Sequence, residues 1–333
     1  MTAKRRLGVL GTLVWDTIWT MDDLERGVPF TSWGGIAYSL AGAAAARSEG
    51  WEVVPIVKVG MDLEAEARAF LATLPGFSVG PSVMPIPVEN NRVELRYTDG
   101  ASRGERQSGG IPGWEWSELE PHLDGLDALF VNFISGFELE LPVAERLRER
   151  FHGPLYTDLH SLFLGCPSAD QRERRRLPEW ERWVACFDGV QLNEDELGTL
   201  AQPGEPMDDT LRRMLAAGPG FVAVTLGPRG AAFAADPSLP ADPSAWPSWR
   251  QARASRPSFT PRTGHVPPPV VSATGDPTGA GDVWGATLIS SLVTGMPLEE
   301  AIAAAHRAAT RKLDHRGATG LYEWLTRAGE ANG

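Results

Sequence analysis

The stretch Gly275-Asp276-Pro277-Thr278-Gly279-Ala280-Gly281-Asp282 is the most informative part of the chain. An apolar, uncharged run over residues 283–294 follows it, which is typical of a buried helix. Small residues at a helix start let the backbone approach a ligand closely, and the free N–H groups there attract an anion. Asp282 lies at the same helix start, where its carboxylate could accept a proton or simply cap the helix. An anion cradle, an oriented nucleophile and a base are the parts that phosphoryl transfer requires.

The rest of the chain alternates between short apolar runs and helical stretches. The runs cover residues 8–13, 53–59, 128–134, 155–159, 189–192 and 221–226. The helical stretches between several of them cover residues 35–47, 63–74, 141–150 and 208–217. This alternation predicts an α/β fold with a mostly parallel central sheet and helices on both faces.

Residues 88–106 interrupt this pattern with a polar hairpin. Val93, Leu95 and Tyr97 alternate with polar neighbours, and Asp99-Gly100 is a dipeptide that favours a hairpin turn. The segment is either an edge hairpin of the main sheet or a lid over a substrate cleft, and the sequence leaves both readings open.

Residues 236–269 contain 9 of the 27 prolines of the chain. This composition predicts a loop or a disordered insertion rather than a packed element. The flanking residues 230–235 and 266–272 have the character of strands from one sheet, so we expect an insertion within a domain and not a boundary between two.

Composition excludes several classes of protein. The 31 Lys plus Arg against 43 Asp plus Glu give a net charge of −12 over 333 residues, which disfavours a nucleic-acid partner. Only Cys166 and Cys186 are present, so a disulfide scaffold or a Cys-rich zinc site is not available. No lysine follows a glycine, which excludes a Gly-Lys-Ser/Thr phosphate loop, and no G-x-G-x-x-G turn opens an early βα unit. Without an apolar run of 18 residues or a convincing secretory signal, we expect a cytoplasmic protein that does not enter a membrane.

The stretch over 276–282 resembles the D-x-T-G-A-G-D signature of the ribokinase-like (PfkB) carbohydrate kinases. Further segments agree with this family in order and spacing. They are Gly34-Gly35, Gly60-Met61-Asp62, Asn193 to Glu196, Val224 to Gly230 and His306 to Ala318. The resemblance covers about residues 7–320. It implies one ribokinase-like kinase domain over 1–333, with small β lid elements near 12–33 and 86–110 and with the Pro-rich segment 236–269 as an insertion.

The resemblance also implies a role for individual residues. Asp282 would be the catalytic base, and the backbone of Gly279, Ala280 and Gly281 would form the anion hole. Asp16, Gly34, Gly35 and Ser39 match substrate-binding positions. Asn193, Thr225, Gly227, Gly230 and His306 match nucleotide-binding positions. Glu196 would act on Mg²⁺ indirectly, and Asp276 and Thr278 match positions that hold K⁺ in related kinases. The implied cofactors are ATP and Mg²⁺, with K⁺ as a further candidate.

The acceptor side departs from the family pattern. Val14 and Ser39 stand where the family has asparagines, and the segment Asp158-Leu159-His160 differs from the common D-x-N-x-R ending. Fewer amide donors suggest an acceptor other than ribose. An aromatic group, namely Trp15, Trp19, Trp33 and Tyr38, could form a wall against a pyranose or a nucleoside base, or could be ordinary core.

The sequence therefore favours a kinase that moves the γ-phosphoryl group of ATP to a hydroxyl of a sugar or sugar-like small molecule. A nucleoside kinase on the same fold and a non-catalytic sugar or nucleotide sensor are the alternatives. We expect no nucleic-acid or membrane partner. The resemblance also leaves open a homodimer formed through the lid.

Overall fold

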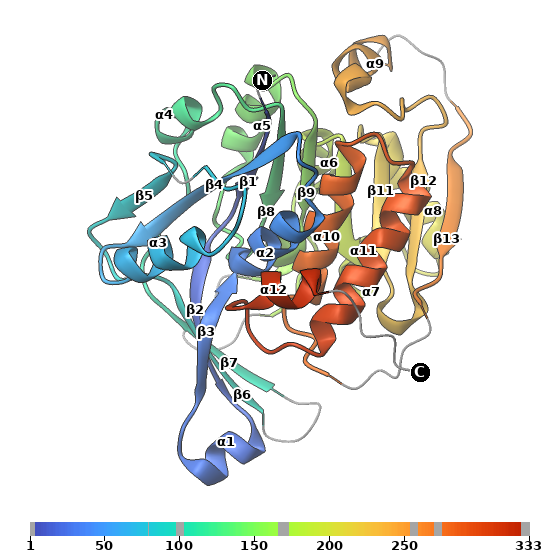
Figure 1. Cartoon of the computed structure of the whole chain (residues 1–333). Helices are drawn as coiled ribbons and strands as arrows, with labels where there is room; N and C mark the ends of the chain where they lie inside the picture. Colours follow the sequence, from blue (N-terminus) through green and yellow to red (C-terminus); the bar gives the residue numbers. More distant parts are fainter. Residues whose placement is uncertain are drawn as a thin grey trace.

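Apolar runs form the strands of a large central sheet in the computed structural model of the chain, which describes residues 4–78, 80–97, 103–165, 173–253, 259–269 and 275–327 (Figure 1). Within these ranges, nine strands pair in the order β13-β12-β11-β10-β9-β8-β1-β4-β5. The strands are β1 (Arg5–Leu10), β4 (Trp51–Gly60), β5 (Val83–Ile86), β8 (Ala128–Asn132), β9 (Leu155–Asp158), β10 (Gly189–Asn193), β11 (Phe221–Thr225), β12 (Ala231–Ala235) and β13 (Arg262–Val266).

Most neighbours in this sheet run parallel. From β5 through β4, β1, β8, β9 and β10 to β11 every pair is parallel, whereas β12 and β13 are added antiparallel at one edge. The carboxyl ends of the parallel strands therefore meet along one edge of the sheet, where ligands of such folds bind. The predicted α/β class with a mostly parallel sheet is confirmed.

Helices cover both faces of the sheet (Figure 1). One face packs against α2 (Ile36–Ala46), α3 (Glu64–Ala72), α10 (Ala280–Leu292), α11 (Leu298–Leu313) and α12 (Leu321–Thr326). The other packs against α4 (Trp116–Leu119), α5 (Leu141–Arg150), α6 (Trp180–Ala185), α7 (Glu194–Leu200) and α8 (Met207–Ala216). Alternate residues of a strand point to opposite faces, so Ala223 joins the first core while Val222 and Val224 join the second.

A second, smaller sheet extends from the main body (Figure 1). Its strands are β2 (Leu13–Trp19), β3 (Phe30–Gly35), β6 (Arg92–Tyr97) and β7 (Arg103–Ser108), in the order β3-β2-β6-β7, and α1 (Met21–Arg26) lies between β2 and β3. The hairpin expected over 88–106 is thus formed by β6 and β7, and it pairs with β2 rather than with an edge of the main sheet. Its Asp99-Gly100 turn lies outside the described residues.

The expectation of an unpacked segment over 236–269 is wrong for much of its length. Residues 246–253 form α9 (Trp246–Arg253), and β13 pairs with β12 at the edge of the main sheet. Trp246 and Trp249 are buried, and the guanidinium of Arg250 contacts the buried carboxylate of Asp188 through two 2.7 Å hydrogen bonds. Of the strand expected over 266–272, Val266 is the last residue of β13, residues 267–269 are not in a strand, and residues 270–272 lie outside the described part of the chain. The proline content led to the wrong prediction, because the prolines at 243 and 247 lie at the starts of helical turns, where proline does not break a helix.

Four short 3₁₀ helices complete the described elements, at Glu120–His122, His160–Phe163, Gly227–Arg229 and Pro243–Ala245. Among the described helices, none combines the length and the apolar character that crossing a membrane requires.

Candidate active site

A cleft of about 1860 Å³ lies between the carboxyl ends of the parallel strands and the small sheet. The last residues of β9, β10 and β11, namely Asp158, Asn193 and Thr225, line it from the main sheet. Leu95 of β6 and Gln107 of β7 line it from the other side. The volume exceeds the roughly 300–1,000 Å³ of a typical small-molecule pocket, so the cleft has room for two ligands at once.

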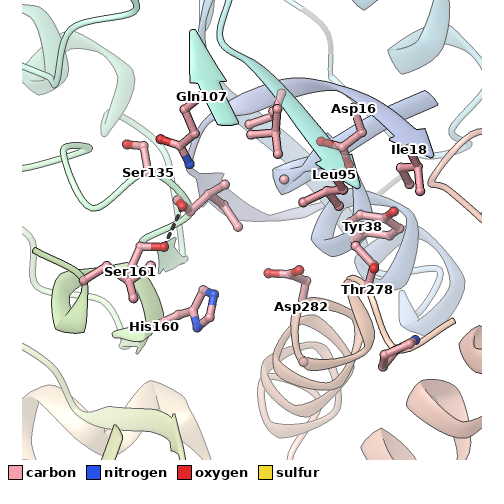
Figure 2. Close-up of a pocket in the computed structure, with 18 of the residues that line it drawn as sticks. Asp16, Ile18, Tyr38, Leu95, Gln107, Ser135, His160, Ser161, Thr278 and Asp282 are labelled. Atoms are coloured by element: carbon pink, nitrogen blue, oxygen red, sulfur yellow. Dashed lines mark hydrogen bonds between the residues drawn. The ribbon is translucent and has the colours of Figure 1, made fainter. Parts of the chain in front are cut away.

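Asp282 points into this cleft from the start of α10 (Figure 2). Asn132, the last residue of β8, donates a hydrogen bond from Nδ2 to Asp282 Oδ1 at 2.7 Å. Burial raises the pKa of Asp282, and the hydrogen bond from Asn132 opposes this shift. The result is a carboxylate held in one orientation and more basic than an exposed aspartate, as a proton acceptor requires.

The glycines before Asp282 bring the backbone to the surface of the cleft. Gly279 is the N-cap of α10 with φ of 77°, and a Cβ on it would lie 2.2 Å from the ring of Tyr38. Gly281 is exposed to the cleft, and a Cβ there would meet nothing within 4 Å. Ala280 N donates to the carbonyl oxygen of Pro277 at 3.1 Å, and Ala280 does not line the cleft. The backbone donors that remain for an anion in the cleft are therefore the N–H groups of Gly279 and Gly281, which do line it.

A group of ionisable side chains lies opposite Asp282. His160 Nδ1 contacts Glu196 Oε1 at 2.7 Å, and Glu196 also accepts hydrogen bonds from the backbone and side-chain nitrogens of Asn193. The side chain of His160 is half exposed to the cleft; its partial removal from water lowers its pKa, but the hydrogen bond and the charge of Glu196 outweigh this effect and raise the pKa to about 9. Figure 2 shows His160 pointing into the cavity, so at neutral pH it adds a positive charge there.

Asp158 connects this group to the helix start. Its carboxylate accepts hydrogen bonds from His160 N and from Gln191 Nε2, and Gln191 Nε2 also contacts the carbonyl oxygen of Gly281 at 3.1 Å. Burial, followed by the negative charge of Glu196, raises the pKa of Asp158. The network fixes the position of α10 relative to β9 and β10.

On the acceptor side, Asp16 and Gly35 line the cleft, whereas Gly34 and Ser39 do not. Gly34 instead leaves room for Asp16, because a Cβ on Gly34 would lie 1.7 Å from Asp16 Oδ2. Ser39 is completely buried and bridges Asn132 Nδ2 and the carbonyl oxygen of Asp282. Ser39 was predicted to bind the substrate, but its hydroxyl contacts Asn132 and Asp282 instead of facing the cleft.

The proposed aromatic wall is wrong for three of its four members. Trp15, Trp19 and Trp33 are absent from the cleft lining, and Trp15 and Trp33 pack edge to face with ring centroids 5.1 Å apart. Tyr38 does line the cleft. Part of the surrounding surface is aliphatic and mixed with the polar side chains of Asn91, Gln107 and Ser135; the aliphatic residues are Val14, Ile18, Val93, Leu95, Ile111 and Ile134.

On the nucleotide side, Asn193, Thr225 and Gly227 line the cleft. Gly230 and His306 do not. The ring of His306 is buried, where it contacts Trp284 Nε1 at 3.1 Å and the carbonyl oxygen of Val266 at 3.1 Å. His306 thus joins α10, α11 and β13 and has no exposed ring nitrogen to offer a nucleotide.

Carboxylates are plentiful in the cleft, but the described residues contain no group of three or more His, Cys, Asp or Glu side chains arranged to hold a metal ion. Both oxygens of Glu196 are already hydrogen-bonded. A magnesium ion would therefore be held by the phosphates and by water, which matches the preference of this ion for keeping its waters.

Asp276 and Thr278 lie at the start of the same loop. Both line the cleft, and Thr278 N donates a hydrogen bond to Asp276 Oδ1 at 3.0 Å. Lys312 of α11 donates from Nζ to the carbonyl oxygen of Asp276 at 2.9 Å, with Oδ2 at 3.4 Å.

Five of these contacting residues were not predicted as site residues: Asn132, Asp158, His160, Gln191 and Lys312. Asn132 and Gln191 are polar residues inside otherwise apolar strand runs, which is a signal that sequence reasoning can use because a buried polar side chain needs a partner. His160 was seen only as a departure from the family pattern. Lys312 gives no local signal, since its partner lies 36 residues away.

Comparisons with known proteins bear on the family and the fold of the chain. Residues 169–325 match the family model of the pfkB family carbohydrate kinases. A search of curated protein sequences finds no match. Among solved structures, a pyrophosphate-dependent kinase in the ribokinase family is similar over 97% of this chain and 100% of its own, with 16% identity and a TM-score of 0.73.

Two further structures show the same fold. The ribokinase of Thermotoga maritima is 16% identical over 97% of this chain and 98% of its own, with a TM-score of 0.71. A nucleoside kinase of Burkholderia thailandensis, solved with inosine, is 14% identical over 95% of this chain and 94% of its own, with a TM-score of 0.65. The chain has the ribokinase-like fold. Together with the match to the pfkB family model, this fold supports a kinase enzyme.

Proposed function

We propose that the protein transfers the γ-phosphoryl group of ATP to a hydroxyl of a sugar or sugar-like small molecule. The observation that carries this proposal is the position of Asp282. An oriented carboxylate of raised pKa lies at the same helix start at which Gly279 and Gly281 line the cleft. A base and an anion site side by side are what phosphoryl transfer to an alcohol needs.

In the proposed reaction, Asp16 orients the acceptor and Asp282 takes the proton of its hydroxyl. The freed oxygen forms a bond to the γ-phosphorus as the bond from phosphorus to the β,γ-bridging oxygen breaks, and ADP leaves. The N–H groups of Gly279 and Gly281 would stabilise the charge on the moving phosphoryl group, whereas the N–H of Ala280 is taken up by Pro277 O. Bound magnesium would neutralise phosphate charge, and His160 would add a fixed cation on the side of Glu196.

The small sheet would act as a lid. Leu95 and Gln107 on β6 and β7 line the cleft opposite the main sheet, so a ligand placed between them and Asp282 is shielded from water. Exclusion of water limits hydrolysis of the donor.

A nucleoside is the second candidate acceptor, and the aliphatic acceptor surface favours it. Six aliphatic side chains line this part of the cleft, and the amides of the family pattern are missing at Val14 and Ser39, which leaves Asn91 and Gln107 as the amides there. A ligand with one polyol edge and one less polar ring fits such a surface better than a free pentose, because unpaired hydroxyls are costly to bury.

The test has two stages. Thermal shift with ATP–magnesium or pyrophosphate–magnesium, each with pentoses, hexoses, cyclitols or nucleosides, selects ligands that stabilise the fold. Release of ADP or phosphate is then measured for each ligand that does. We expect turnover that depends on both an acceptor and ATP. Preference for plain ribose would contradict the reading of the acceptor side. Binding of ATP without phosphorylation of any acceptor would favour a sensor.

A further inference from the structure

The loop before the helix start contains a buried positive charge. Lys312 has a relative exposure of 0% and is carried by the last turn of α11. Its Nζ donates to the carbonyl oxygen of Asp276 at 2.9 Å and lies 3.4 Å from Oδ2 of the same residue. The ring of Tyr38, which packs against Gly279, lies 5.4 Å from Nζ.

These contacts connect the two ends of the anion-hole loop, defined as residues 276–281. Asp276 N donates to the carbonyl oxygen of Leu313 at 2.9 Å, so the loop is attached to α11 by backbone and side chain together. At the other end, Gly279 rests on the ring of Tyr38. Removing the ammonium would leave a buried carbonyl oxygen without its donor, and the position of the loop would be less well defined.

A potassium ion does not fit the atoms that the family resemblance assigns to it. Such an ion would need the oxygens of Asp276, and Lys312 already occupies the carbonyl oxygen and lies beside Oδ2. Asp276 Oδ1 accepts a hydrogen bond from Thr278 N, and Thr278 Oγ1 is buried with no hydrogen-bond partner among the described residues. The lysine ammonium is a compact single positive charge and supplies what a monovalent cation would supply there.

We propose that Lys312 is the built-in cation of the anion-hole loop, and that phosphoryl transfer by this chain therefore needs no potassium ion. This inference rests on the proposed function, because it concerns the loop that holds the transferred phosphoryl group. Lys312 is a positioning residue: it acts on the substrate through the loop.

The first experiment uses the native chain. Turnover is measured in KCl, NaCl and tetramethylammonium chloride at constant ionic strength, and the melting temperature is measured in the same salts. We expect the rates to agree within about twofold and the melting temperatures to show no preference for K⁺, since the site is filled. Activation by K⁺ of about fivefold or more, or a melting temperature raised by K⁺ alone, would overturn the inference.

The second experiment uses Lys312→Met, which keeps the length of the side chain and removes its charge. We expect kcat to fall about 10- to 100-fold, the value of one charge-assisted hydrogen bond, with little change in KM. Potassium or methylammonium should then restore part of the rate and raise the melting temperature, which a purely structural role would not produce. Native kcat in tetramethylammonium chloride would contradict the role assigned to Lys312.

Two controls make the outcome specific. Lys58 is also buried, with 2% exposure, but its ammonium contacts Gly113 O and Glu118 away from the cleft, so Lys58→Met should lose stability without gaining a K⁺ response. Lys312→Arg keeps the charge and should remain independent of K⁺, which covers the case in which Lys312→Met does not fold. A native chain without turnover in any salt would count against the proposed function. The melting temperatures would still show whether the chain binds K⁺, because they do not depend on turnover.

Discussion

Replacing Asp282 with asparagine separates the proposed base from the other contacts of this residue. The side chain keeps its size, and an amide oxygen can accept the hydrogen bond that Asn132 Nδ2 donates to Oδ1 at 2.7 Å. The carbonyl oxygen of residue 282 keeps its contact with Ser39 Oγ. The change therefore removes the proton acceptor and leaves the helix start in place.

The expected loss of kcat is large. A general base contributes about 10²- to 10⁴-fold, which is about 2.7–5.4 kcal/mol at 1.36 kcal/mol for each factor of ten. We expect the upper part of this range, because Asp158 is a poor substitute: its two carboxylate oxygens are engaged by His160 N and Gln191 Nε2. The KM for ATP should change by less than about threefold, since donor binding does not use the carboxylate.

Stability should move in the opposite direction from activity. Burial raises the pKa of Asp282, so the charged carboxylate is less favourable in the folded chain than in the unfolded one. The contribution of such a group to stability is complete below the unfolded pKa of 3.8 and is lost as the pH rises through the folded pKa. Asp282→Asn should therefore melt at the same temperature as the native chain or above it at neutral pH, and lose this advantage in acid.

The assay is steady-state phosphorylation of the best acceptor, measured together with melting curves. Asp236 provides a matched control, because its carboxylate is also buried but lies outside the cleft, where Ser238 and Arg253 contact it. Asp236→Asn should keep native kcat and melt at a lower temperature. If Asp282→Asn kept more than about a tenth of native kcat while remaining folded, Asp282 would not be the base.

Three further changes test other parts of the site and the fold. Gly281→Ala should fold normally, since the added Cβ would meet nothing within 4 Å, but kcat should fall about tenfold or more because the methyl group crowds the phosphoryl group. Gly198→Ala on α7 is the control: its Cβ also meets nothing within 4 Å, and its kinetics should stay native. Asn132→Ala should move the acid limb of the pH–rate profile to higher pH. The variant loses the hydrogen bond that lowers the pKa of Asp282, so Asp282 becomes protonated at a higher pH. An unchanged acid limb would mean that Asp282 does not set it. Asp188→Asn should lower the free energy of unfolding in urea by about 2–3 kcal/mol, because it weakens the ion pairs of Asp188 with Arg148 and with Arg250 of α9. A decrease below about 0.5 kcal/mol would mean that these pairs do not hold α9 in place.

Local patterns predicted most of the main sheet. Each of the apolar runs from 53–59 to 221–226 contains a strand, because residues that face two covered sides must be apolar throughout. The helix after Asp282 was predictable for a similar reason, since it is buried over most of its length. The signature over 276–282 was enough to propose Asp282 as the base.

Contacts between distant segments were not predictable from such patterns. Asn132 and Asp282 are 150 positions apart, and only the fold brings β8 to the start of α10. The same holds for Lys312 and Asp276, so the sequence left K⁺ open as a ligand where the structure places an ammonium. The tryptophans near 15–33 looked like a binding surface because composition cannot tell which side of a strand faces the cleft.

The central claim is that this chain makes a phosphate ester from ATP and an alcohol. It is tested most directly by ³¹P NMR of the native chain with ATP, magnesium and an acceptor selected by thermal shift. We predict a new phosphomonoester resonance that grows in step with ADP and is absent without the acceptor. Release of inorganic phosphate alone, at a rate that the acceptor does not change, would contradict the account.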